Sequence, residues 1–189
     1  IMSHQRMTAL SKSYKNVIVD CAQAFFCKPV EGCLTVYSCR KFVGVPNGAY
    51  VVGKDAHKYI EEYPQCYSSD TAAFLLKRIE YGCEGKGYEA RGINEARIDS
   101  EDCMKMSKLT RALMDAEDYN YNQQKRRENF EYAHTLLGGV NKLSPKIYYD
   151  KDTIPMVYPL LVEDEDLLQK LFAAKHFQGH WWSYICNEQ

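Results

Sequence analysis

Long apolar runs are missing from this chain of 189 residues. No stretch approaches the roughly 20 consecutive apolar residues that a membrane-spanning helix needs, and residues 1–6 lack the apolar core of a secretion signal. Lysine plus arginine total 24 against 25 aspartate plus glutamate, which leaves a net charge of −1. This balance gives no electrostatic reason to expect nucleic acid or an anionic membrane as a partner. We therefore expect a cytoplasmic protein that binds neither.

Paired cysteine motifs are also missing, although the chain holds eight cysteines. None of them forms a Cys-x-x-Cys pair, and a chain in which 46% of the residues are hydrophobic can bury a core without disulfides. His176 and His180 stand four residues apart, but no glutamate follows His176 and Gly179 would interrupt a helix. We expect free thiols and no metal site.

The most informative segment is the apolar run that ends in Asp20. It predicts a short buried strand, and a second apolar run ends just before Ser38, Arg40 and Lys41. Ligands of open α/β sheets bind beyond the carboxyl ends of the strands. A carboxylate, a hydroxyl, a guanidinium and an amine gathered there suit a ligand with a cationic ring nitrogen, a phosphate and an aldehyde. Pyridoxal phosphate has all three groups.

These segments resemble the cofactor-binding core of the fold-type I pyridoxal-phosphate enzymes, a superfamily that includes aminotransferases and cysteine desulfurases. In that pattern a strand-ending aspartate is followed three residues later by glutamine or histidine. A Ser-x-His-Lys-like segment and a glycine-rich turn come next. The matching residues here are Asp20, Gln23, Ser38, Lys41, Gly44 and Gly48, with Arg40 where histidine is commoner.

The remainder of the chain most resembles the DegT/StrS-type sugar aminotransferases. Residues 105–113 resemble the helix that follows their active-site lysine, and residues 124–130 resemble the start of their interdomain helix. The resemblance implies a homodimeric enzyme that uses pyridoxal phosphate to move an amino group from a small donor to a keto-sugar. It also implies a partial chain that lacks the N-terminal part of the fold.

The resemblance assigns a role to each candidate residue. Lys41 would form the internal aldimine with the cofactor and carry the proton, with its pKa lowered by burial. Asp20, as a buried carboxylate, would pair with the pyridinium nitrogen. Gln23 would donate to the ring's phenolic oxygen, and Ser38 and Arg40 would bind the phosphate. Arg40 could instead be a structural ion-pair partner, and Asp20 could simply cap the following turn.

Two alternative functions stay open. The short spacing from Ser38 to Lys41 is closer to that of cysteine desulfurases and lyases, which need a reactive cysteine, and Cys83 is the weak candidate. The other alternative is a non-catalytic, truncated remnant of the fold. Arg126 and Arg127 could hold a substrate carboxylate, but their spacing beside Glu128 is more typical of a solvated helix face.

The expected fold class is α/β. Residues 1–118 would be the C-terminal portion of an aminotransferase-like large domain, with a parallel-type sheet and helices, and residues 119–189 a small C-terminal α/β domain. Residues 82–94, with four glycines, are expected to form an exposed loop. Strands are predicted at 17–20, 34–37, 48–52, 156–162 and 181–185, and helices at 6–14, 55–63, 72–79, 100–113, 119–137 and 164–175.

Overall fold

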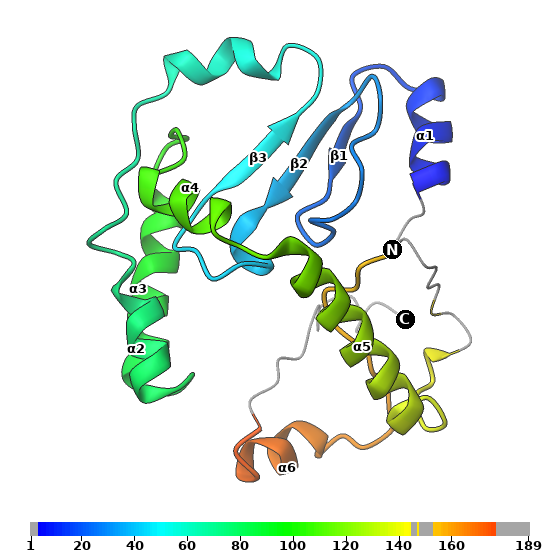
Figure 1. The fold of residues 1–189 in the computed structure, drawn as a ribbon. Helices are drawn as coiled ribbons and strands as arrows, with labels where there is room; N and C mark the ends of the chain where they lie inside the picture. The colour runs from blue at the N-terminus through cyan, green and yellow to red at the C-terminus, as the bar shows by residue number, and fades with distance from the viewer. Residues whose placement is uncertain (1–3, 145–146, 148–152, 177–189) are drawn as a thin grey trace.

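The computed structural model of the chain describes residues 4–144, 147 and 153–176. Within these ranges it has a mixed α/β fold, as the sequence predicts (Figure 1). The strand predicted at 181–185 lies outside the described residues. The strands are β1 (Ile18–Asp20), β2 (Leu34–Ser38) and β3 (Ala49–Val52). The helices are α1 (His4–Ser13), α2 (Ala73–Tyr81), α3 (Lys86–Ser100), α4 (Lys108–Asp115), α5 (Tyr119–Leu137) and α6 (Leu167–Ala173), with short 3-10 helices η1 (Cys39–Lys41) and η2 (Ala56–Glu62).

The strands form a three-stranded sheet in the order β1-β2-β3. β1 runs parallel to β2, whereas β3 runs antiparallel to it. All three strands lie where the sequence predicts them, but the sheet is mixed rather than parallel. The reason is the short connection from β2 to β3, because a return to the parallel direction needs a crossover of a dozen or more residues.

One face of the sheet is covered over β1 and β2, whereas β3 is exposed on both faces. Val19 and Tyr37 are buried in a cluster that includes the segment after β1, and Met7 of α1 packs against it. On the opposite face, Ile18 is 66% exposed and Val51 is 52% exposed. Figure 1 shows α1 beside β1, at the edge of the sheet remote from the other helices.

A second buried cluster joins the segment after β2 to α4. Its members are Cys39, Phe42, Val43, Val45 and Met114, with Phe25, Phe26 and Tyr119 packed around them. The rings of Phe25 and Phe42 stack with their centroids 5.7 Å apart. This cluster fixes the chain immediately after the predicted site lysine.

The exposed loop predicted for residues 82–94 is wrong, because most of it belongs to α3. Gly87 lies in the first turn of α3, where a Cβ atom would come within 2.4 Å of the Gly82 carbonyl oxygen. The glycine therefore allows α3 to approach the end of α2 closely. Further along the helix, buried Asn94 donates a hydrogen bond to the Pro46 carbonyl at 2.8 Å.

The helix predicted to begin at Ser100 is wrong as well, since α3 ends there and α4 begins only at Lys108. Between them, Lys105 forms an isolated parallel bridge with Gln65. The Lys105 amide donates to the Pro64 carbonyl at 2.8 Å. Ser107 then caps α4, because its hydroxyl accepts from the Thr110 amide at 3.0 Å.

The strand predicted at 156–162 is also wrong, for the segment is extended but pairs with no strand among the described residues. Pro159 cannot donate to a ladder. The buried Asn141 side chain binds this segment instead, accepting from the Leu161 amide at 3.0 Å and donating to the Pro159 carbonyl at 2.8 Å. Beyond the extended segment, α6 occupies the middle of the helix expected at 164–175.

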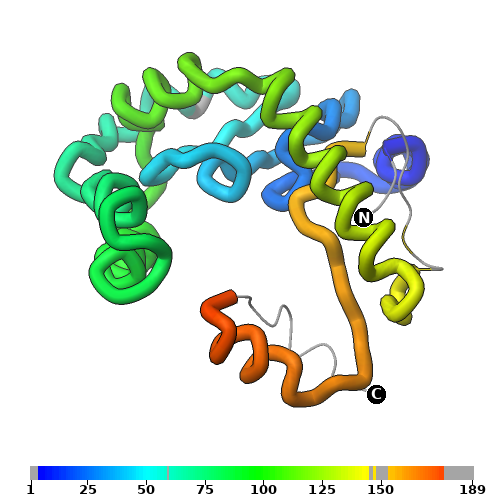
Figure 2. Tube along the Cα trace, turned by 60° about the horizontal axis from the view of Figure 1, so that its bottom comes forward, coloured from blue at the N-terminus to red at the C-terminus, as the bar shows by residue number. Residues whose placement is uncertain are grey.

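Helix α5 spans the residues predicted for it, and its N-terminus is capped by the Asp118 carboxylate, which accepts from the Tyr121 amide at 3.0 Å. Figure 2 shows α5 continuing the line of α4, with α2 and α3 at one side and α6 set apart beyond the extended segment. From residue 119 onward, the described part of the chain contains helices and no strand. No helix within the described ranges is both long and apolar enough to cross a membrane.

Replacing Gly48 by alanine should destabilise the protein. Gly48 has φ = +104°, and a Cβ atom would lie 2.8 Å from the Thr110 methyl carbon. Left-handed strain and overpacking together predict a loss of about 2 kcal/mol in the free energy of unfolding. Gly44→Ala is the matched control, since nothing lies within 4 Å of its Cβ position. Urea denaturation measures both, and equal stability of the two variants would contradict the structure.

Candidate functional site

Asp20 and Ser38 lie on the same face and at the same end of the sheet. The parallel register pairs Asp20 with Val36, and Ser38 stands two residues beyond Val36 on β2. Since strand side chains alternate between faces, all three share one face. At about 3.3 Å per residue, Ser38 is about 7 Å further along the strand direction than Val36. The sheet thus brings together the carboxylate and hydroxyl that the sequence singles out.

The Asp20 carboxylate is exposed, not buried as the sequence suggested. Its Oδ1 atom accepts a hydrogen bond from the Ala22 amide at 2.8 Å. This bond stabilises the turn that carries half-buried Gln23, closed by the Ala24 amide donating to the Cys21 carbonyl at 2.9 Å. Asp20 caps the turn through one oxygen, which leaves the other available for a ligand.

Lys41 lies at the end of η1, directly after β2. The amides of Phe42 and Val43 both donate to the Cys39 carbonyl at 3.0 Å. Phe42 and Val43 are buried, whereas the Lys41 side chain is exposed. The predicted burial of this lysine is therefore wrong, although its backbone lies between anchored neighbours.

Arg40 forms an ion pair with Glu95 of α3. Arg91, one turn earlier on the same helix, places its Nε atom 3.7 Å from the other Glu95 oxygen. Arg40 is therefore used as a structural ion-pair partner between η1 and α3. A phosphate could reach the guanidinium only in competition with this carboxylate.

A chain of polar side chains, three of them buried and Asn47 half-buried, holds the turn between η1 and β3. We call Asn47, Ser68, Ser107 and Thr110 the hydroxyl network. Thr110 Oγ1 donates to Asn47 Oδ1 at 2.5 Å, and Ser107 Oγ donates to Thr110 Oγ1 at 3.0 Å. The hydroxyls of Ser68 and Ser107 are 2.6 Å apart. Asn47 is thereby tied to α4 and to the segment before α2.

Two thiols flank the site residues, Cys21 after Asp20 and Cys39 after Ser38. Burial raises the pKa of each from 9.0 to about 11, and the neighbouring Cys27 thiol and Asp20 carboxylate add to the effect at Cys21. Both therefore stay protonated at neutral pH. A protonated, buried thiol is a poor nucleophile, so neither is a candidate for covalent chemistry.

Arg126 is a residue whose role the sequence pattern missed. Its predicted place on a solvated face is wrong, because its guanidinium is half-buried and its Nη2 atom donates to the Phe42 carbonyl at 3.1 Å. The guanidinium carbon also lies 4.6 Å from the centroid of the Phe42 ring. These contacts span 84 positions of the sequence, so helical spacing alone gives no sign of them.

No protein-family model, curated protein or solved structure matches this chain. Across the described residues, no group of three or more histidine, cysteine, aspartate or glutamate side chains could hold a metal ion. The cysteines in these ranges are free thiols: Cys21, Cys27, Cys33, Cys39, Cys66, Cys83 and Cys103. Function must therefore be inferred from the placement of the individual site residues.

Removing the Thr110 hydroxyl should destabilise the turn beside the site. Thr110→Val keeps the shape of the side chain but removes the donor to half-buried Asn47 Oδ1 and the acceptor of the buried Ser107 hydroxyl, at a cost of about 1–3 kcal/mol. Thr135→Val is the control, since the exposed Thr135 hydroxyl bonds only the Tyr132 carbonyl of its own helix. Chemical denaturation compares the two, and a Thr110→Val variant as stable as the control would show that the network contributes little.

Proposed function

We propose that this chain belongs to a pyridoxal-phosphate-dependent enzyme of the fold-type I superfamily, with amino transfer to a keto-sugar as its activity. The observation that carries the proposal is the placement of Asp20, Ser38 and Lys41. The parallel register puts Asp20 and Ser38 on one face at the carboxyl end of neighbouring strands, and Lys41 follows within one short helical turn. This is where open α/β sheets bind their ligands.

The residues fit the cofactor in part. Asp20 keeps one carboxylate oxygen for a protonated ring nitrogen, because only Oδ1 bonds the following turn. The Ser38 hydroxyl, half-buried on the same face, suits a phosphate oxygen. Exposed Lys41 stands three residues after the end of β2, and Gln23 lies in the turn that Asp20 caps. Arg40 fits least, since Glu95 already neutralises it.

When bound, pyridoxal phosphate supplies an electron sink for the bonds broken at an amino acid Cα atom. The residues of the chain would bind and orient the cofactor. Asp20 would hold a proton on the ring nitrogen, because a carboxylate stabilises a nearby cation. Lys41 would hold the cofactor covalently and move a proton to and from its Nζ atom. We further propose that the enzyme is a homodimer. Its amino group would come from a small donor and pass to a keto-sugar acceptor.

A cysteine desulfurase or lyase is the second candidate, and one observation favours it. Cys83 is exposed in the turn between α2 and α3, where the Arg78 Nη2 atom donates to its sulfur at 3.2 Å. An accessible sulfur is what a nucleophilic cysteine requires, and the hydrogen bond from Arg78 holds this one at a defined place. A desulfurase would consume cysteine as substrate and require Cys83, whereas an aminotransferase would tolerate Cys83→Ala.

Covalent trapping tests the proposed function. The protein is incubated with pyridoxal phosphate and reduced with borohydride, which makes the bond between a lysine amine and the cofactor's aldehyde carbon permanent. Peptide mass spectrometry then locates the modification. We expect it predominantly at Lys41, because a site lysine is held beside the bound cofactor whereas other exposed lysines meet it only by collision.

Lys41→Ala should abolish the modification, whereas the control Lys28→Ala, at another exposed lysine, should leave it unchanged. Scattered labelling of exposed lysines, unaffected by Lys41→Ala, would contradict the proposal for this chain. That result would favour the remaining alternative, a fold remnant without catalytic function.

A further inference from the structure

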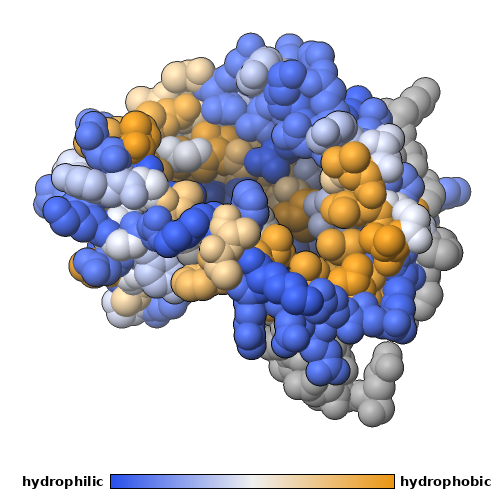
Figure 3. Space-filling view, turned by 90° about the horizontal axis from the view of Figure 1, so that it is seen from below, coloured by the Kyte–Doolittle hydropathy of each residue, from blue (hydrophilic) through white to orange (hydrophobic). Residues whose placement is uncertain are grey.

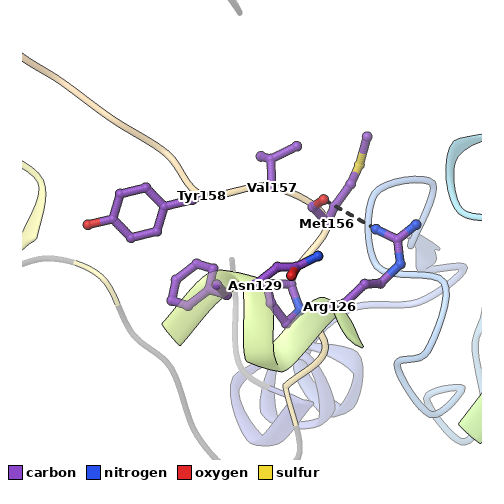
Figure 4. A pocket seen from close by; sticks show the side chains of 7 residues that line it. Arg126, Asn129, Met156, Val157 and Tyr158 are labelled. Carbon is purple, nitrogen blue, oxygen red and sulfur yellow. Dashed lines mark hydrogen bonds between the residues drawn. The ribbon is translucent and has the colours of Figure 1, made fainter. Parts of the chain in front are cut away.

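A cavity lies between α5 and the extended segment that follows it. Arg126, Asn129 and Phe130 line it from the helix, and residues 155–158 line it from the other side. Its volume is about 210 Å³, below the range of about 300–1,000 Å³ typical of pockets for drug-sized ligands. Figure 4 shows Asn129 beside Arg126 on the helix, with the segment that carries Met156, Val157 and Tyr158 running past them and the Met156 carbonyl bonded to Arg126. Any ligand here must be small.

The extended segment is held against α5 at a defined place. The Tyr158 hydroxyl lies 3.0 Å from His134 Nδ1 of α5 and accepts from Asn141 Nδ2 at 3.1 Å. The Phe130 and Tyr158 rings meet edge to face, with centroids 5.1 Å apart. These contacts make one wall of the cavity aromatic. They also hold the extended segment at a fixed position relative to α5, which defines the shape of the cavity.

Arg126 is the one cation among the cavity-lining residues, and its environment is unusual. Its Nε, Nη1 and Nη2 atoms donate to Asn122 Oδ1 at 2.7 Å, to the Met156 carbonyl at 3.3 Å and to the Phe42 carbonyl at 3.1 Å. In the described structure no carboxylate lies within ion-pair distance of it. Arg40 and Arg97, by contrast, each pair with a glutamate.

Arg126 therefore has an unpaired positive charge and N–H groups that bond to no other residue among those described. A guanidinium has five N–H groups, and three are used, which leaves one on each terminal nitrogen. Burial lowers the pKa of Arg126, and the nearby Glu117 carboxylate only partly offsets this. An anion placed at the two remaining N–H groups would stabilise the half-buried cation.

We propose that this cavity is a binding site for a small carboxylate with a short apolar body. Two N–H groups of Arg126 remain for the two oxygens of a carboxylate, and paired N–H···O bonds are the way in which arginine binds carboxylates best. The Asn129 amide, beside Arg126 on the rim, offers a further donor. Phe130, Pro155 and Val157 supply an apolar wall that a compact phosphate ion would leave uncontacted.

The site is separate from the proposed cofactor site, and its assignment does not depend on that function. The two are linked through Phe42, the residue after Lys41, because Arg126 binds its carbonyl and lies over its ring. Figure 3 shows that apolar side chains also gather on the face of the molecule seen from below. Exposed Val157, Leu160 and Leu161 of the extended segment are among the large apolar residues at the surface of the described structure.

Butyrate and butyramide provide a matched pair of probes, because they share a shape and differ in charge. Amide NMR spectra of the whole chain are recorded during titration with each, and with inorganic phosphate. Butyrate should shift the Asn129 side-chain amide and the Val157 backbone amide, and should bind at least about tenfold more tightly than either other probe. Equal shifts with butyramide, or tighter binding of phosphate, would overturn the proposal.

Variants assign the binding to Arg126. Arg126→Met should weaken butyrate binding about tenfold or more, and the control Arg111→Met, at an exposed position of α4, should not change it. Because Arg126 also holds backbone carbonyls, Asn129→Leu serves as a second variant at an exposed position and should weaken binding severalfold. Undiminished binding in Asn129→Leu together with equal losses in the two arginine variants would overturn the proposal.

Discussion

The hydrogen bond from Thr110 to Asn47 is the contact on which the arrangement of sheet and helices depends. At 2.5 Å it joins the turn between η1 and β3 to the first turn of α4. The Thr110 amide donates to the Ser107 hydroxyl that caps α4. The side chains of Ser107 and Thr110 therefore both begin the helix and hold the turn in place. Ser107 and Thr110 are essentially inaccessible to solvent, and Asn47 is half-buried. A buried polar contact of this kind is costly to break, because its partners cannot turn to water.

Arg126 provides a second attachment on the other side of the same segment. Its guanidinium binds the Phe42 carbonyl, while the Thr110 hydroxyl binds Asn47. The backbone around Lys41 is thus anchored to α4 and to α5, yet the lysine side chain remains exposed. A rigid backbone with an accessible amine is what covalent attachment of a ligand requires, because the amine can approach the ligand without disturbing the fold.

The short strands and the long helix could be predicted from the sequence because their signals are local. Apolar runs end at polar residues at Asp20 and Ser38, and α5 is bounded by Asp118 and by Gly138. Alternation along the strands then places Asp20 and Ser38 on one face once their register is known. The positions of Asp20 and Ser38 in the proposed site therefore follow more directly from the sequence than the rest of the structure does.

The errors arise where distant contacts override local preference. Glycines suggested a loop at 82–94, but Gly87 serves the close packing of α3 against α2. The segment before α4 leaves the helical conformation because Lys105 bonds the backbone near Gln65. The burial of Arg126 depends on Phe42 and Met156, which no helical pattern reveals. The partners of Lys105 and Arg126 lie far away in the sequence, and that of Gly87 lies on the preceding helix, so in each case a contact between elements overrides the local preference.

The protonation state of the cofactor ring nitrogen would test the role of Asp20 most directly. Pyridoxal phosphate labelled with ¹⁵N in the ring is added to the protein and to Asp20→Asn, and the nitrogen chemical shift is measured well above the pH at which the free ring loses its proton. We predict a protonated nitrogen in the protein and an unprotonated one in Asp20→Asn, because only the carboxylate stabilises the cation. An unprotonated nitrogen in both would contradict the placement of the ring against Asp20.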